Sequence, residues 1–185
     1  MRPRLLPLVV ALTLVVAACA PDGTGAGGES TDPGAGGGPD PAWRTAVLTD
    51  VRTGETFTVD GLRGSLVAIE PMAIWCTTCR AQQGEAAAAL DQLAHPDLVY
   101  VSLDVDPNED AADLADYADD LGFGWRFVVA TPEVAGSLAD AFGPQILSPP
   151  STPLIVVGPD GTVVEQHYGI VRAADLADQL ARHLP

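Results

Sequence analysis

Hydrophobic positions beyond residue 43 recur with two periods, one typical of strands and one typical of helices. Short apolar or alternating runs predict strands at 66–69, 98–105, 126–130, 154–157 and 162–166. Apolar side chains three and four positions apart predict helices at 76–94, 110–121, 132–142 and 173–184. Two further runs, 45–48 and 56–59, flank the turn residues 52–54 and predict a small β-hairpin.

After the hairpin, strands and helices alternate along the chain. This order predicts an α/β fold in which helices flank a central sheet. Strands that follow one another through a helix are expected to run parallel, with right-handed crossovers. The last two strands are instead joined by the turn sequence G-P-D-G at 158–161. We therefore expect a mixed sheet, preceded by the N-terminal β-hairpin.

The charge of the chain narrows its possible partners. Among 185 residues there are 25 Asp+Glu and 9 Lys+Arg, a formal net charge of −16 at pH 7, and every basic residue is Arg. A surface this acidic repels phosphate, which makes nucleic acid a poor partner. Apolar residues make up 47% of the chain, which excludes a wholly disordered protein.

The N-terminal stretch has the pattern of an export signal. Residues 1–18 combine two Arg with an apolar run at 5–18, shorter than the roughly 20 residues of a membrane span. The exit, V-A-A-C at 16–19, resembles the bacterial lipoprotein box. This resemblance implies that residues 1–18 are removed and that Cys19 is lipidated. The alternatives are an ordinary cleaved signal or a short uncleaved anchor.

Residues 19–42 predict a flexible tether, and the folded domain is expected at 43–185. The stretch 20–41 holds 8 Gly and 4 Pro and shows no apolar periodicity. Such a segment buries too little surface to offset the entropy of ordering it. A lipid on Cys19 would hold the domain near the membrane and leave it free to reorient.

Two cysteines with a helical spacing, Cys76 and Cys79, follow the first long strand. Residues i and i+3 are neighbours on a helix, so their sulfurs can bridge. Cys76 at the helix N-terminus would have its thiolate favoured, and the thiolate is the attacking form in disulfide exchange. Cys79, one turn inside, would resolve the mixed disulfide. A zinc site or a purely structural bridge are the alternatives, although zinc needs two more ligands.

The motif W-C-T-T-C at 75–79, together with T-P at 152–153 and the late G-P-D-G hairpin, resembles the thioredoxin superfamily. Within it, the chain looks most like the exported, membrane-attached TlpA/ResA-type thiol–disulfide oxidoreductases. The resemblance implies a thioredoxin-like fold and a cis proline, Pro153, that faces the dithiol. Thr152 would then offer its backbone to the substrate, while Pro149 and Pro150 are set aside as neighbours without this role.

Glu70 lies six positions before Cys76, at the end of an apolar strand. Several thioredoxin-like enzymes carry a buried acid at this offset, which implies that Glu70 exchanges a proton with Cys79. Burial should raise its pKa toward the range of a general base. The alternative is an exposed carboxylate where Pro71 ends the strand. Trp75 is expected to shield the dithiol and offer an apolar surface to the substrate, with simple packing as the rival interpretation.

A second resemblance is to the Sco family, which is thioredoxin-like, binds copper and helps assemble cytochrome oxidase. It rests on residues 102–107 and 124–127. The Sco copper site uses two Cys separated by three residues and a distant His. Here two residues separate Cys76 and Cys79, and Ser148 to Ser151 stand where the His is expected. The acids of residues 104–110 resemble a cation loop but lack the pattern of an EF-hand, so we expect a solvated helix start.

The sequence therefore predicts a lipid-anchored thiol–disulfide oxidoreductase on the outer face of the bacterial cytoplasmic membrane, with a copper-binding Sco-like protein as the alternative. We expect no cofactor, no metal and a monomer. Its partners would be protein thiols and disulfides and a membrane redox partner, with apocytochrome c thiols as one substrate implied by the family. The residues permit either direction of electron flow.

Overall fold

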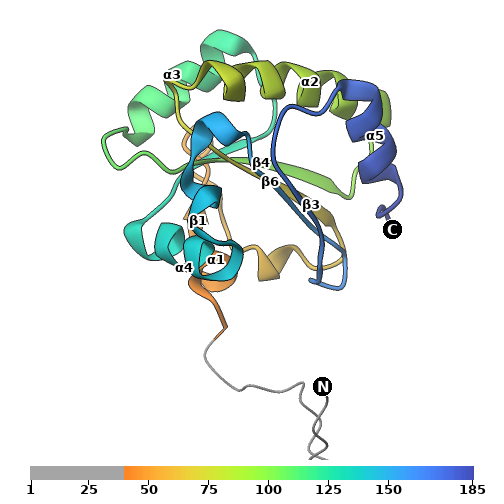
Figure 1. Ribbon diagram of the computed structural model, residues 1–185, viewed down its shortest axis with the longest axis horizontal. Coiled ribbons are helices and arrows are strands. Elements are labelled where there is room, and N and C mark those ends of the chain that lie inside the picture. The colour runs from red at the N-terminus through yellow and green to blue at the C-terminus, as the bar shows by residue number, and fades with distance from the viewer. Residues whose placement is uncertain (1–39) are drawn as a thin grey trace, which may run out of the picture. The chain divides into compact units, whose positions relative to one another are not determined.

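The computed structural model describes residues 40–185 and shows an α/β domain (Figure 1). Its strands are β1 (Leu48–Thr49), β2 (Thr56–Phe57), β3 (Leu66–Met72), β4 (Leu98–Asp104), β5 (Arg126–Val129), β6 (Leu154–Val157) and β7 (Val163–His167). Its helices are α1 (Ala42–Thr45), α2 (Thr77–Leu93), α3 (Ala111–Leu121), α4 (Pro132–Phe142) and α5 (Ala173–Ala181). Three short 3-10 turns complete it: η1 (Asp60–Leu62), η2 (Pro144–Leu147) and η3 (Pro149–Ser151).

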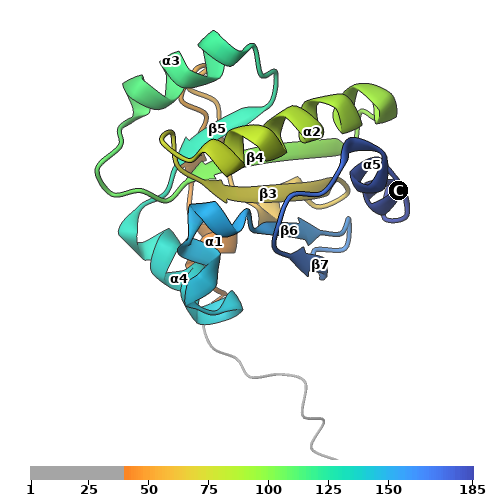
Figure 2. The same cartoon turned by 45° about the horizontal axis from the view of Figure 1, so that its top comes forward.

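The central sheet has five strands in the order β5-β4-β3-β6-β7, and Figure 2 shows them side by side. The strands β3, β4 and β5 are parallel, whereas β6 and β7 run antiparallel to their neighbours. The strands β1 and β2 form a separate antiparallel pair. The predicted fold class, a mixed sheet flanked by helices with an N-terminal β-hairpin, is confirmed.

Helices cover both faces of the sheet. One face packs against α1 and α4 through buried apolar residues such as Ile69, Val101 and Leu138. The other face packs against α2, α3 and α5, with Ala68, Ala86 and the α5 leucines among the buried residues. Figure 1 shows α2, α3 and α5 together on one side of the sheet and α1 and α4 on the other. Because side chains alternate along a strand, β3 supplies residues to both layers.

The boundaries differ from the prediction where contacts distant in sequence decide them. The strand β3 continues through Pro71 to Met72 because it pairs with β4 over its whole length, whereas its pairing with β6 covers only residues 67–69. The helix α1 and the turns η2 and η3 were not predicted. The predicted export signal, the lipidation of Cys19 and nearly all of the tether lie outside the described residues. Within residues 40–185, no helix is both long enough and apolar enough to cross a membrane.

Candidate functional site: a disulfide at the start of α2

The two cysteines form a disulfide at the point where the chain leaves β3 and enters α2. The bond joins Cys76 to Cys79, with Cα atoms 5.3 Å apart. Cys76 has an extended backbone and is the N-cap of α2, and its Sγ accepts a hydrogen bond of 3.1 Å from the backbone N–H of Cys79. The pairing expected from the spacing is therefore confirmed.

The start of α2 favours negative charge on Cys76. The first N–H groups of a helix lack acceptors inside the helix and carry the positive end of its dipole. One of them, from Cys79, already points at the Cys76 sulfur. After reduction the same donor would stabilise a thiolate at Cys76, the form of cysteine that attacks a disulfide.

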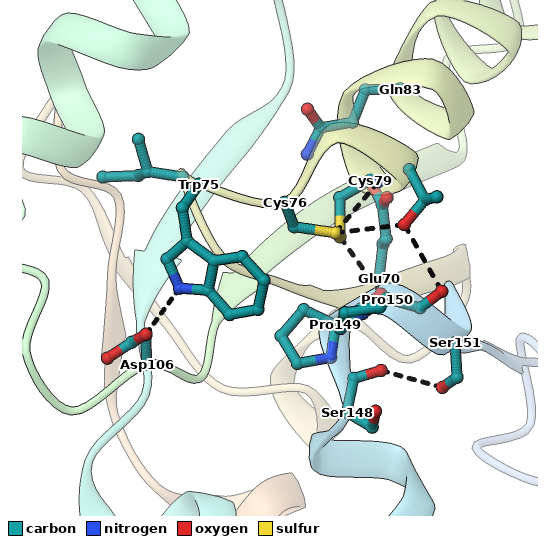
Figure 3. Close-up of a disulfide and its surroundings, with 12 residues drawn as sticks. Glu70, Trp75, Cys76, Cys79, Gln83, Asp106, Ser148, Pro149, Pro150 and Ser151 are labelled. Carbon is teal, nitrogen blue, oxygen red and sulfur yellow. Dashed lines mark hydrogen bonds between the residues drawn. A yellow bond between two sulfur atoms is a disulfide. The ribbon is translucent and has the colours of Figure 1, made fainter.

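The turn η3 lies against the sulfurs from the opposite side. The Cys79 Sγ is 3.2 Å from the carbonyl oxygen of Pro149, and Figure 3 shows this turn beside the disulfide. The hydroxyl of Thr78 lies 3.3 Å from both the Cys76 Sγ and the carbonyl oxygen of Pro150. A disulfide sulfur carries no proton, so the contact between Cys79 and Pro149 is a hydrogen bond only when the pair is reduced.

The expected cis bond before Pro153 is wrong. Every peptide bond in residues 40–185 is trans, and Thr152 adopts a left-handed conformation with φ 44° and ψ 63°. The chain therefore reverses through η3 and Thr152 before it enters β6, which places Pro149 and Pro150 opposite the sulfurs. Both Thr152 and Pro153 are buried. No local sequence signal indicates this arrangement, because consecutive prolines permit several turns. The substrate-binding role of Thr152 and Pro153 stays a prediction.

Glu70 is fully buried on the face of β3 that α2 covers. One carboxylate oxygen accepts hydrogen bonds from the hydroxyls of Tyr100 (3.2 Å) and Ser102 (3.4 Å), while the other has no partner. Desolvation raises the pKa of Glu70 to about 8, against the smaller lowering effects of Tyr100, Ser102 and Gln83. The expectation of a buried carboxyl with a raised pKa is thus confirmed, and its role in proton transfer stays a prediction.

A layer of polar side chains surrounds Glu70 beneath α2. The hydroxyl of Ser102 also accepts a 2.9 Å hydrogen bond from the indole N–H of Trp125. Gln83, one turn along α2 from Cys79, accepts a hydrogen bond from the hydroxyl of Tyr117. Sequence reasoning missed this network, although a serine inside an otherwise apolar strand was a visible signal for it.

Trp75 is exposed beside the disulfide, with 56% of its surface open to solvent. Its indole N–H donates a 2.6 Å hydrogen bond to the carboxylate of Asp106, as Figure 3 shows. The preceding backbone N–H, that of Ile74, donates a 2.8 Å bond to Glu109. The expected shielding and substrate-binding role of Trp75 stays a prediction, and the two carboxylates that hold this loop were not predicted to do so.

The disulfide itself is nearly covered. Cys76 is 2% exposed and Cys79 is fully buried, and both belong to the apolar cluster with Met72, Leu114 and Phe127. The pair is therefore almost closed to solvent, with η3 in contact with Cys79 and Thr78.

The acids of residues 104–110 do not form a cation site of the usual kind. Within residues 40–185 no group of three or more His, Cys, Asp or Glu side chains is arranged to hold a metal ion. Asp110 instead caps α3, accepting hydrogen bonds from the backbone N–H groups of Ala112 and Asp113. A helix does start here as expected, but Asp104 is fully buried and therefore not part of a solvated surface.

No family model and no curated protein matches the chain. Solved structures do resemble it. A thiol:disulfide interchange protein of the thioredoxin family from Chlorobium tepidum TLS superposes with a TM-score of 0.63 at 20% identity, over 75% of this chain and 92% of that one. ScoI from Arabidopsis thaliana, with copper bound, gives a TM-score of 0.59 at 17% identity, over 74% and 94%.

A third similar structure is BsSco, a member of the Sco family of cytochrome c oxidase assembly proteins. It gives a TM-score of 0.60 at 17% identity, over 74% of this chain and 90% of that one. At these identities the similarity establishes the fold, which is thioredoxin-like, as the sequence motifs implied. It does not distinguish the activity of the thiol:disulfide interchange protein from that of the Sco proteins.

Proposed function

We propose that this protein is a thiol–disulfide oxidoreductase that exchanges disulfides with protein substrates through Cys76 and Cys79. One observation carries the proposal. The disulfide sits at the start of α2, where the Cys79 N–H points at the Cys76 sulfur, above a buried carboxyl whose pKa lies near that of a thiol. A structural bridge over so short a loop would contribute only roughly 2 kcal/mol of stability, which is a weak use of this arrangement.

The reaction begins with the reduced pair. The Cys76 thiolate attacks one sulfur of a substrate disulfide, and the other substrate sulfur leaves as a thiolate. Cys79 then gives its proton to Glu70 in its ionised form and attacks the Cys76 sulfur, which releases the second substrate thiolate. The substrate gains two electrons, the cysteine pair loses two and becomes a disulfide, and the released thiolates take up protons. The reverse sequence oxidises a dithiol substrate.

Glu70 suits the proton transfer because its pKa of about 8 lies close to the ordinary pKa of a thiol, about 8.5. Proton transfer between groups of similar pKa proceeds in either direction without a large free-energy cost. The carboxyl oxygen that lacks a partner leaves room for an additional hydrogen bond.

Exposed apolar side chains flank the dithiol and would contact the substrate. Trp75 lies on one side, and Ile170 is 48% exposed in the loop before α5. The N–H of Gly169, next to Ile170, donates a 2.8 Å hydrogen bond to the carbonyl of Ser151, which ties this loop to η3. A substrate with apolar residues beside its cysteine fits such a surface.

We further propose that Cys19 carries the lipid expected from the sequence and that residues 19–42 tether the domain outside the cytoplasmic membrane. The support is the sequence pattern alone. Cells grown with radiolabelled fatty acid should label the wild-type protein but not Cys19→Ala. Continued labelling of Cys19→Ala would contradict the anchoring proposal.

The copper-binding alternative fits the residues less well. Cu(I) prefers soft thiolate, thioether and imidazole ligands. The structure places the carbonyl oxygen of Pro149 beside the Cys79 sulfur and that of Pro150 beside the Thr78 hydroxyl, and carbonyl oxygens are hard ligands. Titration of Cu(I) against a strong chelator tests this alternative, since tight one-to-one binding that requires a His would support it.

The main experiment measures insulin reduction by the full chain, purified in detergent with dithiothreitol as electron donor. We expect wild type to accelerate the reduction and Cys76→Ser to give only the rate without enzyme. Equal rates for the two proteins would contradict the proposed activity. The reduction potential of the pair, measured in glutathione buffers, then shows whether the protein donates or accepts electrons.

A further inference from the structure

The loop between β4 and α3 holds the segment that delivers Cys76 to the helix. Glu109 accepts a 2.8 Å hydrogen bond from the N–H of Ile74, and Asp106 accepts a 2.6 Å bond from the indole of Trp75. Ile74 and Trp75 are the two residues directly before Cys76. The contacts join positions more than 30 residues apart in the chain.

We propose that Glu109 and Asp106 are positioning residues for the dithiol: Glu109 fixes the backbone in front of Cys76, and Asp106 fixes the exposed indole against which a protein substrate docks. The inference rests on the proposed function for its kinetic consequences. It extends that function by adding two residues that touch neither sulfur.

The geometry explains why one backbone hydrogen bond matters here. Cys76 starts α2, and its own N–H donates to the carbonyl of Ala73, so the segment 73–76 forms a tight turn. Ile74 is inside that turn, and Glu109 is the acceptor that holds its N–H. Displacement of a reacting group by about 1 Å can slow a reaction roughly 100-fold. A turn without its anchor would lose part of the alignment of Cys76 with Cys79.

Asp104 supports this anchor from below. It is fully buried at the end of β4, and its carboxylate accepts a 2.9 Å hydrogen bond from the N–H of Asp106. Desolvation, together with the negative charges of Glu109 and Asp106, raises the pKa of Asp104 to about 7. The second carboxyl oxygen of Asp104 has no hydrogen-bond partner, so Asp104 supports the anchor through its bond to the backbone of Asp106.

Asp106 is in the opposite electrostatic state. The indole N–H of Trp75, followed by Asn108, lowers the pKa of Asp106 below its usual range. The carboxylate therefore stays ionised at neutral pH and accepts from the indole through a charge-assisted hydrogen bond. This bond limits the rotation of an exposed tryptophan, which reduces the entropy that a docking substrate would otherwise have to remove.

The first test compares Glu109→Ala with Glu109→Gln. Glutamine keeps an acceptor for the Ile74 N–H, whereas alanine removes it. We expect Glu109→Ala to slow exchange with a small disulfide, such as hydroxyethyl disulfide, about tenfold, and Glu109→Gln to stay within about threefold of wild type. Asp116→Ala is the matched control, because Asp116 is an exposed acid on α3 with no hydrogen bond to the dithiol loop.

The same variants are compared at equilibrium with glutathione. A loosened turn holds the two sulfurs together less well, and the loss of a nearby negative charge stabilises the Cys76 thiolate. Both effects favour the reduced form, so the potential of Glu109→Ala should rise by about 30 mV, which corresponds to tenfold in the equilibrium constant. Asp116→Ala should not move it. A purely structural role of Glu109 would lower the melting temperature and leave this potential unchanged.

The second test concerns Asp106 and Trp75. We expect Asp106→Ala and Trp75→Phe each to raise KM for insulin about threefold to tenfold, with a smaller change in kcat. The double variant should match Trp75→Phe, because the carboxylate then has no indole to hold. Additive effects of the two substitutions would show that Asp106 acts independently of Trp75.

The outcomes separate this inference from the proposed function. If wild type exchanges disulfides and Glu109→Ala keeps both its rate and its equilibrium constant with glutathione within twofold of wild type, the positioning role of Glu109 is wrong. If wild type shows no exchange with any protein, the proposed function is wrong. The glutathione equilibrium still tests the positioning of the sulfurs in that case, because it needs no protein substrate.

Discussion

The two faces of the central sheet differ in the polarity of the side chains that β3 and β4 contribute to them. On the face covered by α1 and α4, the strands β3 and β4 contribute only apolar side chains, among them Val67, Ile69, Val101 and Leu103. On the face covered by α2 and α3, the same two strands contribute Glu70, Ser102 and Asp104, all fully buried. Alternation along a strand thus separates the two chemistries by a single residue.

This difference shows which face of the sheet stabilises the domain most and which face lowers its stability. Apolar burial on the α1 and α4 face is favourable, apart from the indole N–H of Trp43, which has no hydrogen-bond partner. The opposite face leaves buried polar atoms without partners, including one oxygen of Glu70 and one of Asp104. Such groups cost free energy, and natural proteins concentrate this cost at functional sites. Substitutions on the two faces should therefore have different consequences.

The largest effect is expected at the dithiol itself. Cys79→Ser should attack a substrate normally through Cys76 but fail to resolve the mixed disulfide, so turnover should fall by about a thousandfold or more. The covalent complex should be visible by non-reducing electrophoresis and disappear with reductant. Cys76→Ser should form no complex. A complex formed equally through Cys79 would reverse the roles assigned to the two cysteines.

Glu70→Gln should change how stability depends on pH. In the unfolded chain this carboxyl ionises near pH 4.5, whereas in the folded protein it keeps its proton up to about pH 8. Stability is therefore retained below pH 4.5 and is lost as pH rises through 8, by on the order of 5 kcal/mol. Urea unfolding of the oxidised protein at pH 5 and pH 9 should show this loss in wild type.

The glutamine variant should lack that loss and be the more stable protein at pH 9, while its resolving step becomes slower. Glu165→Gln serves as the control, since that acid lies on β7 away from the site. Equal pH dependence of Glu70→Gln and wild type would contradict the assignment of the raised pKa to Glu70.

Ile69→Ala tests the apolar face. It removes buried volume next to Glu70 in sequence but on the opposite side of the sheet, so unfolding free energy should fall by about 2–5 kcal/mol. The reduction potential of the remaining folded protein should stay that of wild type. A joint change in both quantities would show that the faces are coupled through β3. Ile69→Val provides a milder version, with an expected loss of about 1 kcal/mol.

The smallest effect is expected at Thr78, whose hydroxyl lies between the Cys76 sulfur and the carbonyl of Pro150. Thr78→Val keeps the shape and removes the hydroxyl, so the glutathione equilibrium constant should change only about twofold to fivefold. Thr78→Ser should restore it. No difference between valine and serine would mean that the hydroxyl does not influence the pair.

Much of the fold could be predicted because its signals are local. The helix α4 spans 132–142 as expected, since Thr131 caps it, Pro132 occupies its first turn and Gly143 follows its end. The dithiol was equally visible, because the spacing of Cys76 and Cys79 and the preceding strand lie within one short segment. The burial of Glu70 followed from its place in an apolar strand.

The rest depends on contacts between distant segments. The turn η3 approaches the sulfurs only after the sheet has formed, so nothing near Pro149 in the sequence indicated that its carbonyl, and not a cis Pro153, would face Cys79. Likewise, Glu109 and Ile74 are 35 residues apart. A run of acids next to a helix start looks like a solvated surface until the fold shows which of them accept hydrogen bonds from the residues before Cys76.

Because the Cys79 sulfur contacts the Pro149 carbonyl, the oxidised and reduced proteins should hold the turn η3 with different strength. In the oxidised protein the Cys79 sulfur and the Pro149 carbonyl oxygen are 3.2 Å apart with no hydrogen between them. In the reduced protein the buried Cys79 thiol carries a hydrogen, and the Pro149 carbonyl accepts a hydrogen bond from it. The reduced protein would thus hold η3 against Cys79 by a hydrogen bond that the oxidised protein lacks, so that the oxidised form is the one in which η3 moves away more easily.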